Sequence, residues 1–226
     1  MKHWERLGSA IIPRTSDSLN LYKGKDDYFI LLNDRHELMS TRKHGSEDEL
    51  GRLPCSQIAQ VDDARVLIGG LGMGFTLAAA LIEVSSNAVV TVAELVPEVV
   101  EWNRSPLGAA SGYPLNDPRT RVYPGDVAEL LRGGGEDYDV IALDVDNGPE
   151  GLTARGNDWL YAMDGIMAAI NSLRPGGIVA YWSAIRDRKF RKRLSHCGLK
   201  VDEVSVFAHG TKGTRHTIWL ASEKGL

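Results

Sequence analysis

Cysteine is scarce in this sequence, which has 226 residues and only two cysteines, Cys55 and Cys197. Neither belongs to a CxxC pair, and no group of cysteines and histidines has the spacing of a zinc site. We therefore expect no disulfide framework and no metal centre, and a reducing cytoplasm is the default location.

An excess of positive charge is also lacking. The chain has 26 lysines and arginines against 30 aspartates and glutamates, a formal net charge of -4. Nucleic-acid binding depends on a basic surface that displaces counterions from phosphates, so the composition argues against nucleic acid as a primary partner. The one basic stretch, Arg186–Arg193, is more typical of a solvated helix face than of an RNA contact.

Long hydrophobic runs are missing, apart from the uncharged segment Val66–Ile82. A membrane-spanning helix needs about 20 apolar residues, and glycines crowd the middle of this segment. The segment is better explained as a strand, a tight loop and a helix. The charged residues Lys2, Glu5 and Arg6 are not followed by an apolar core, so we expect neither a membrane span nor an export signal.

Short apolar runs alternate with helical stretches from residue 64 onward. Five of these runs predict buried strands: Val66–Ile68, Ala88–Ala93, Arg121–Tyr123, Val140–Leu143 and Ile178–Trp182. Strands separated by helices indicate a parallel sheet with right-handed crossovers. Two alternating runs, Val201–Ala208 and Thr217–Ala221, add a closing antiparallel hairpin. The prediction is an α/β, Rossmann-like fold with a mostly parallel seven-stranded sheet and an antiparallel last strand.

The first 60 residues have a different pattern. Leu19–Tyr22 and Tyr28–Leu32 are typical of strands, and Ser46–Gln60 is typical of a helix that begins at a Ser46 cap. We therefore expect a short β-appendage with a linking helix over residues 1–60, and a Rossmann-like nucleoside-binding catalytic domain over 61–226.

A glycine-rich loop follows the first predicted strand, with Gly70, Gly72 and Gly74 at alternate positions. Glycines at such a turn let the backbone approach a ligand at the carboxyl end of the strand. The dinucleotide fingerprint would need a sixth-position glycine where Phe75 stands, and no lysine follows as in a P-loop. Pyrophosphate cofactors and nucleoside triphosphates are disfavoured.

Acidic residues end the next strands. Glu94 follows the second strand and could accept both hydroxyls of a ribose, whereas a solvated glutamate is the plainer alternative. Asp126 follows the third strand and could accept an adenine amino group, although Gly-Asp is also an ordinary turn. Asp144 and Asp146 follow the fourth strand, where they form either a site or a turn. This pattern predicts a pocket for an adenosine without a diphosphate, such as S-adenosylmethionine or decarboxylated S-adenosylmethionine.

An ordered set of motifs resembles the spermidine synthase-like (aminopropyltransferase-like) family, within the class I S-adenosylmethionine-dependent superfamily. The set reads VLIGGLGMG, VAELVPEVVEWN, DPRTRVYPGD, YDVIALDVDNGP, LYAMDG and LRPGGIVAYWS. The resemblance implies a cytoplasmic transferase of polyamine biosynthesis with a methyltransferase fold, and it suggests a homodimer. It implies these nucleoside-binding residues: Gly70, Gly72 and Gly74 for the methionine part, Glu94 for the ribose, and Asp126 with Val127 for the adenine.

The same resemblance implies the catalytic residues. Asp144 falls at the family's catalytic carboxylate, where it would also contact the cofactor, and Asp146 could hold a second ammonium of a polyamine. Tyr161 matches an aromatic position of the family, although an aromatic residue at a helix start is more often simple packing. A neutral amine must attack the carbon beside a sulfonium, so Asp144 is expected to accept the proton of a small-molecule amine.

Several positions depart from the family pattern. The family's glycine loop usually contains an aspartate that receives the ligand's amino group, and here Gly72 stands in that neighbourhood. Glu37 occupies what is usually a glutamine. Arg42, Lys43 and His44 could meet the carboxylate of intact S-adenosylmethionine or form an exposed basic turn.

Two other functions stay open. One is methyl transfer from S-adenosylmethionine to a small molecule or other nucleophile. The other is a non-catalytic, nucleoside-binding regulatory protein. His216, near Trp219 on the last strand, is expected to be structural rather than catalytic.

Overall fold

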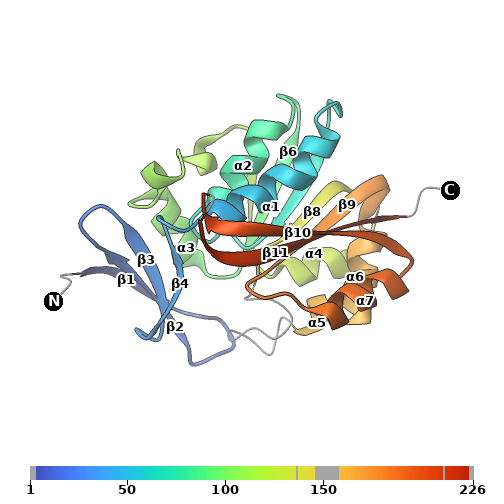
Figure 1. The fold of residues 1–226 in the computed structure, drawn as a ribbon. Helices are drawn as coiled ribbons and strands as arrows, with labels where there is room; N and C mark the ends of the chain where they lie inside the picture. Colours follow the sequence, from blue (N-terminus) through green and yellow to red (C-terminus); the bar gives the residue numbers. More distant parts are fainter. Residues whose placement is uncertain (1–3, 136, 146–157, 211, 224–226) are drawn as a thin grey trace.

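The structure is a computed structural model that describes residues 4–135, 137–145, 158–210 and 212–223, whose strands form two β-sheets (Figure 1). The N-terminal sheet is antiparallel in the order β1-β2-β3-β4. Its strands are β1 (Glu5–Ile11), β2 (Ser18–Lys23), β3 (Tyr28–Leu32) and β4 (His36–Ser40). Leu21 pairs with Ile30 across β2 and β3, and both side chains are buried in the main hydrophobic core.

The larger sheet has the order β10-β11-β9-β8-β5-β6-β7. Its strands are β5 (Arg65–Gly69), β6 (Val89–Glu94), β7 (Thr120–Pro124), β8 (Tyr138–Leu143), β9 (Leu173–Ser183), β10 (Leu199–His209) and β11 (Lys212–Glu223). Strands β5 to β9 pair in parallel, and β11 is antiparallel to both β9 and β10. This confirms the predicted mostly parallel seven-stranded sheet with an antiparallel last strand.

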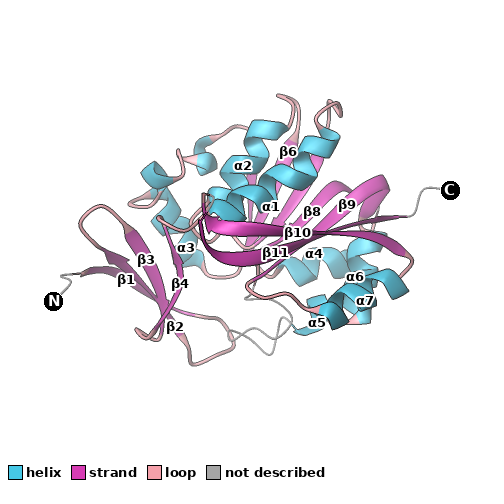
Figure 2. Cartoon of the chain, viewed as in Figure 1, coloured by secondary structure: helices cyan, strands magenta, loops and turns pink. Residues whose placement is uncertain are grey.

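Helices cover both faces of this sheet (Figure 2). One face carries α1 (Gly45–Cys55), α2 (Phe75–Glu83) and α3 (Pro97–Arg104); the other carries α4 (Val127–Gly133), α5 (Asp158–Tyr161), α6 (Met163–Asn171) and α7 (Arg188–His196). Strand β5 shows why both faces must be covered, because Val66 and Ile68 are buried on the first face and Leu67 on the second. None of the described helices is long and apolar enough to cross a membrane.

The N-terminal region differs from the prediction in two details. Only two strands were expected, but β1 and β4 extend the sheet to four. Strand β1 is mostly exposed and β4 is only partly buried, so their sequences carry little hydrophobic signal. The predicted Ser46 cap is wrong, because α1 begins at Gly45 after His44. The Ser46 hydroxyl instead lies 2.8 Å from Nδ1 of His216 on β11.

The N-terminal sheet packs against the larger domain through a glycine. A Cβ on Gly8 of β1 would lie 2.6 Å from the indole nitrogen of Trp102 on α3. Only a residue without a side chain lets β1 lie this close to that ring. The contact holds the small sheet beside the carboxyl ends of the parallel strands.

Candidate active site

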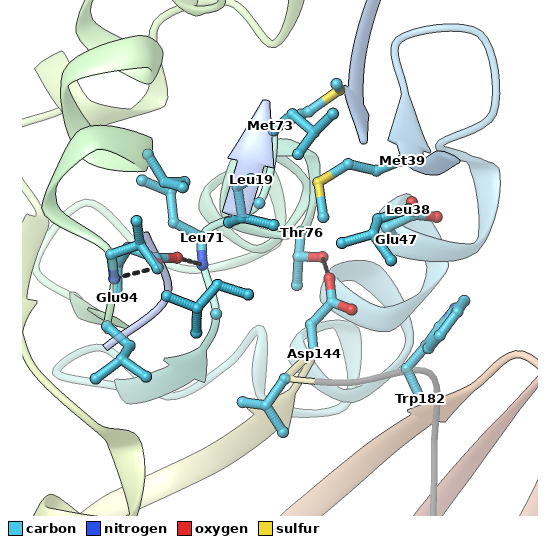
Figure 3. A pocket seen from close by; sticks show the side chains of 18 of the residues that line it. Leu19, Leu38, Met39, Glu47, Leu71, Met73, Thr76, Glu94, Asp144 and Trp182 are labelled. Carbon is cyan, nitrogen blue, oxygen red and sulfur yellow. Dashed lines mark hydrogen bonds between the residues drawn. The ribbon is translucent and has the colours of Figure 1, made fainter. Parts of the chain in front are cut away.

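A cavity of about 1200 Å³ lies between the N-terminal sheet and the carboxyl ends of β5, β6, β7 and β8. Its lining comes from the glycine loop, from the residues that end each of these strands, and from the β1–β2 loop and β4. Ligands of open parallel sheets bind beyond the carboxyl ends of the strands, and this cavity lies at that edge. Figure 3 shows this cavity from close by.

The glycine loop forms one wall. Gly70 and Gly72 line the cavity with φ angles of 91° and 52°. A Cβ on Gly70 would collide with the carbonyl oxygen of Asp144, so the loop passes against the end of β8 only because this residue is glycine. Gly74 was expected to line the ligand as well, but its Cβ position faces Asn103 behind the loop, where the chain turns into α2.

Glu94 lies at the carboxyl end of β6 and is buried in the wall of the cavity. Its two carboxylate oxygens accept hydrogen bonds from the backbone amides of Leu71, at 2.9 Å, and Val96, at 2.8 Å (Figure 3). Burial raises the pKa of Glu94, and the backbone hydrogen bonds oppose that rise. The side chain therefore fastens the glycine loop to β6, besides any contact with a ligand.

Asp126 and Val127 line the end of the cavity beyond β7. Asp126 caps α4, since its carboxylate accepts a hydrogen bond from the Ala128 amide at 2.9 Å. Arg14, in the loop between β1 and β2, reaches across the cavity to within 3.9 Å of the same carboxylate. Val127 packs beneath, with its methyl groups 3.1 Å from the Cβ position of Gly69.

Asp144 lies just after β8 and lines the same cavity from the sheet side. The hydroxyl of Thr76 on α2 donates a hydrogen bond to it at 3.1 Å (Figure 3). Burial raises the pKa of Asp144 to about 7, and the negative charge of Glu47 adds to the rise, while the Thr76 bond opposes it. A carboxylate with this pKa can both hold and release a proton near neutral pH.

No protein-family model and no curated protein matches this sequence. Two solved structures are similar over 97% of this chain, each at 18% sequence identity. One is a spermidine synthase from Thermotoga maritima, with a TM-score of 0.77 and 73% of its own chain covered. The other is a spermidine synthase in complex with the transition state analogue AdoDATO, with a TM-score of 0.75 and 72% covered.

The chain has the spermidine synthase fold. This confirms the predicted Rossmann-like, class I architecture with a small N-terminal sheet. Because one fold supports many reactions, the function has to be argued from the residues of the cavity.

Two residues that line the cavity, Glu47 and His216, were not predicted from the sequence to be site residues. Glu47, in the first turn of α1, lines the cavity and acts electrostatically on Asp144. Burial raises the pKa of Glu47, and the hydrogen bond from the Ser46 hydroxyl opposes that rise. Ser46 also lies within hydrogen-bond distance of His216, which lines the cavity and packs edge-on against Trp182.

Not every predicted site residue lies at the cavity. Tyr161 is buried in the second hydrophobic cluster, where its ring centroid is 5.3 Å from that of Phe190 and 6.0 Å from that of Tyr181. The structure thus favours the packing alternative for Tyr161, and we keep no catalytic role for it. Asp146 lies outside the described residues.

The three consecutive basic residues Arg42, Lys43 and His44 do not all face the main cavity. Arg42 pairs with Asp27 at 3.3 Å, and His44 pairs with Asp48 at 2.8 Å. Only Lys43 of the three lines the main cavity. Within the described part of the chain, no group of three or more histidine, cysteine, aspartate or glutamate residues could hold a metal ion.

Proposed function

We propose that this protein transfers an alkyl group from a sulfonium nucleoside to a small amine, with Asp144 as the base. The observation that carries the proposal is the position of Asp144: a carboxylate with a raised pKa, beside a second carboxylate, in a cavity that also contains Glu94 and the glycine loop. The similarity to spermidine synthases supports the same class of reaction, and the resemblance of the sequence motifs implies aminopropyl transfer from decarboxylated S-adenosylmethionine as its form.

The nucleoside end of the cavity fits an adenosine. Glu94 lies in the cavity wall at the carboxyl end of β6, where its carboxylate can accept hydrogen bonds from ribose hydroxyls. Asp126 can accept from the adenine amino group, and Val127 offers an apolar surface to the ring. When bound, the sulfonium group supplies an electrophilic carbon. The chain's own task is to orient the nucleoside and the amine.

The part of the cavity lined by Glu47 and Asp144, where the acceptor amine would bind, has the negative charge that attracts an ammonium group. Burial raises the pKa of both Glu47 and Asp144, and the charge of Glu47 raises the pKa of Asp144 further, because like charges in a poorly solvated site repel one another. An ammonium group between them would relieve this repulsion and bind well. Asp144 can then take the proton that the amine must lose before its lone pair attacks the carbon.

Calorimetry and a rate assay test the proposal together. We expect 5′-methylthioadenosine, the nucleoside without the transferred group, to bind the wild-type protein and the Asp144→Asn variant equally. We expect Asp144→Asn to lower kcat by about 10²- to 10⁴-fold, the usual contribution of a general base. Failure of this nucleoside to bind would overturn the nucleoside site, and an unchanged kcat would overturn the role of Asp144.

Methyl transfer is the second candidate, and one observation favours it. Gly72 stands in the part of the loop where the family usually has an aspartate. A Cβ built on Gly72 would lie 3.3 Å from the sulfur of Met39. The donor's amino group therefore finds no carboxylate on this loop. S-adenosylhomocysteine as the nucleoside product would identify methyl transfer, and methylthioadenosine would identify transfer of the longer group. Nucleoside binding without turnover of any amine would identify the regulatory alternative. The homodimer that the resemblance suggests stays a prediction.

A further inference from the structure

An ion pair stands at the rim of the cavity, formed by two residues to which the proposed chemistry assigns no role. Nζ of Lys43 lies 3.2 Å from Oε1 of Glu37, and both side chains line the cavity. The side chains are 57% and 30% exposed, so both charges are open to a ligand. An exposed pair of this kind contributes little to stability, and it can be altered without unfolding the protein.

The turn after β4 directs Lys43 to the cavity. Lys43 donates its backbone amide to the carbonyl of Ser40, which closes the turn. Its neighbour Arg42 points the other way, to Asp27 and to the ring of Phe29, whose centroid is 4.9 Å from the guanidinium carbon. The charge of Lys43 also contributes, after burial, to lowering the pKa of His216 on the cavity wall. Lys43 is therefore a cation of the cavity, whereas Arg42 belongs to the N-terminal sheet.

Glu37 and Met39 are two residues apart on β4 and both line the cavity. The pairing of β3 with β4 shifts register between Ile30–Met39 and Leu31–Glu37, and in this irregular stretch Glu37, Leu38 and Met39 all line the cavity. Met39 reaches the glycine loop at Gly72 and is seen above Thr76 in Figure 3. A chain that leaves the sulfur of a bound nucleoside and passes Gly72 would meet Met39 first and then the Glu37–Lys43 pair.

We propose that the Glu37–Lys43 pair binds the amino-acid end of the donor, with Glu37 on its ammonium and Lys43 on its carboxylate, so that the protein takes intact S-adenosylmethionine in preference to the decarboxylated form. Opposite charges held side by side match a zwitterion whose two charges are on one carbon. Decarboxylation removes the donor's only anionic group and leaves Lys43 facing a ligand with two positive charges. This inference rests on the proposed function, since it uses the same nucleoside site.

Calorimetry with three ligands tests the preference. Methylthioadenosine reports the nucleoside site alone, because it has no charged tail. We expect S-adenosylmethionine to bind at least tenfold more tightly than decarboxylated S-adenosylmethionine. Equal or tighter binding of the decarboxylated ligand overturns this inference and leaves the proposed function standing, provided that methylthioadenosine binds. If none of the three ligands binds, the proposed function and this inference both fail.

Matched variants assign the preference to Lys43. Lys43→Met should weaken S-adenosylmethionine about tenfold and leave methylthioadenosine unchanged. Arg42→Met removes the neighbouring cation and should change neither affinity. Glu37→Gln should weaken both tailed ligands, because each has an ammonium. Unaltered S-adenosylmethionine binding in Lys43→Met, or an equal loss in Arg42→Met, would overturn the assignment.

Discussion

Asp144 makes the free protein sensitive to pH. Its pKa is about 7 in the folded chain because of burial and the charge of Glu47, whereas an aspartate in an unfolded chain titrates near 4. Between these values the folded state binds more protons than the unfolded state. The contribution of this group to the free energy of unfolding is therefore fully present below pH 4 and is lost as the pH rises through about 7.

The variant Asp144→Asn should not lose stability in this way as the pH rises. We expect Asp144→Asn to be more stable than the wild-type protein at pH 8, by on the order of 1 kcal/mol, since one pKa unit corresponds to about 1.4 kcal/mol and the open cavity screens part of the effect. At pH 4 the two proteins should be close in stability. Urea unfolding at both pH values measures this, and a destabilised variant at pH 8 would contradict the stated environment of Asp144.

Glu94 should matter for the loop as well as for a ligand. Glu94→Gln keeps the shape but replaces one oxygen by an amide donor, so either the Leu71 or the Val96 amide loses its acceptor. A buried, unpaired amide costs about 1 to 3 kcal/mol, and we expect the free energy of unfolding to fall by that amount. Methylthioadenosine should also bind more weakly, by calorimetry.

The control is Glu98→Gln, at an exposed carboxylate in the first turn of α3. It should cost only the few tenths of a kcal/mol of a helix-terminal charge. Equal stability of the two variants would show that Glu94 does not hold the loop.

At the scale of elements, the close approach of α1 and α2 positions the catalytic candidates. Gly51 of α1 faces α2, and a Cβ there would collide with the carbonyl oxygen of Thr76 and lie 2.9 Å from the Ala80 amide. Thr76 is the residue that donates to Asp144, and Glu47 lies one turn before Gly51 on α1. Because Gly51 lets α1 pack closely on α2, the carboxylates of Glu47 and Asp144 lie in the same cavity.

Gly51→Ala should therefore destabilise the protein, although alanine favours helices. Overpacking of a tight interface costs about 1 to 3 kcal/mol, and we expect a net loss in this range by urea unfolding. The neighbouring Arg52→Ala removes only an exposed ion pair with Glu49 and should cost less than about 0.5 kcal/mol. A Gly51→Ala variant as stable as the wild type would contradict the close packing.

Elements with strong local patterns were predicted correctly from the sequence. The strand that ends at Gly69, its glycine loop and the strand that ends at Glu94 each carry a continuous apolar run and a clear stop. Strands β1 and β4 were missed because edge strands with exposed faces lack such runs. The Ser46 cap was wrong because a tertiary contact with His216 takes the hydroxyl that a local rule assigns to the helix.

At the scale of the whole molecule, residues from both sheets line the cavity, so only part of the site can be predicted from the sequence. Gly70, Glu94, Asp126 and Asp144 could be placed together because strand ends of one parallel sheet share an edge. Lys43 could be named only as one of three basic residues. Nothing local indicates that β4 would cover the glycine loop, or that α1 would bring Glu47 to Asp144. Such contacts depend on how the small sheet docks.

Ligand binding should therefore stabilise the cavity-lining segments of both sheets together. Methylthioadenosine at 100 times its dissociation constant should raise the free energy of unfolding by about 2.7 kcal/mol. In hydrogen exchange of the full chain, we expect slower exchange in the glycine loop and, equally, in residues 12–17 and 37–40, because all of them line the cavity. Residues of α7, on the far face of the large sheet, serve as the internal control. Protection confined to the glycine loop and Glu94 would mean that the N-terminal sheet does not close over the ligand.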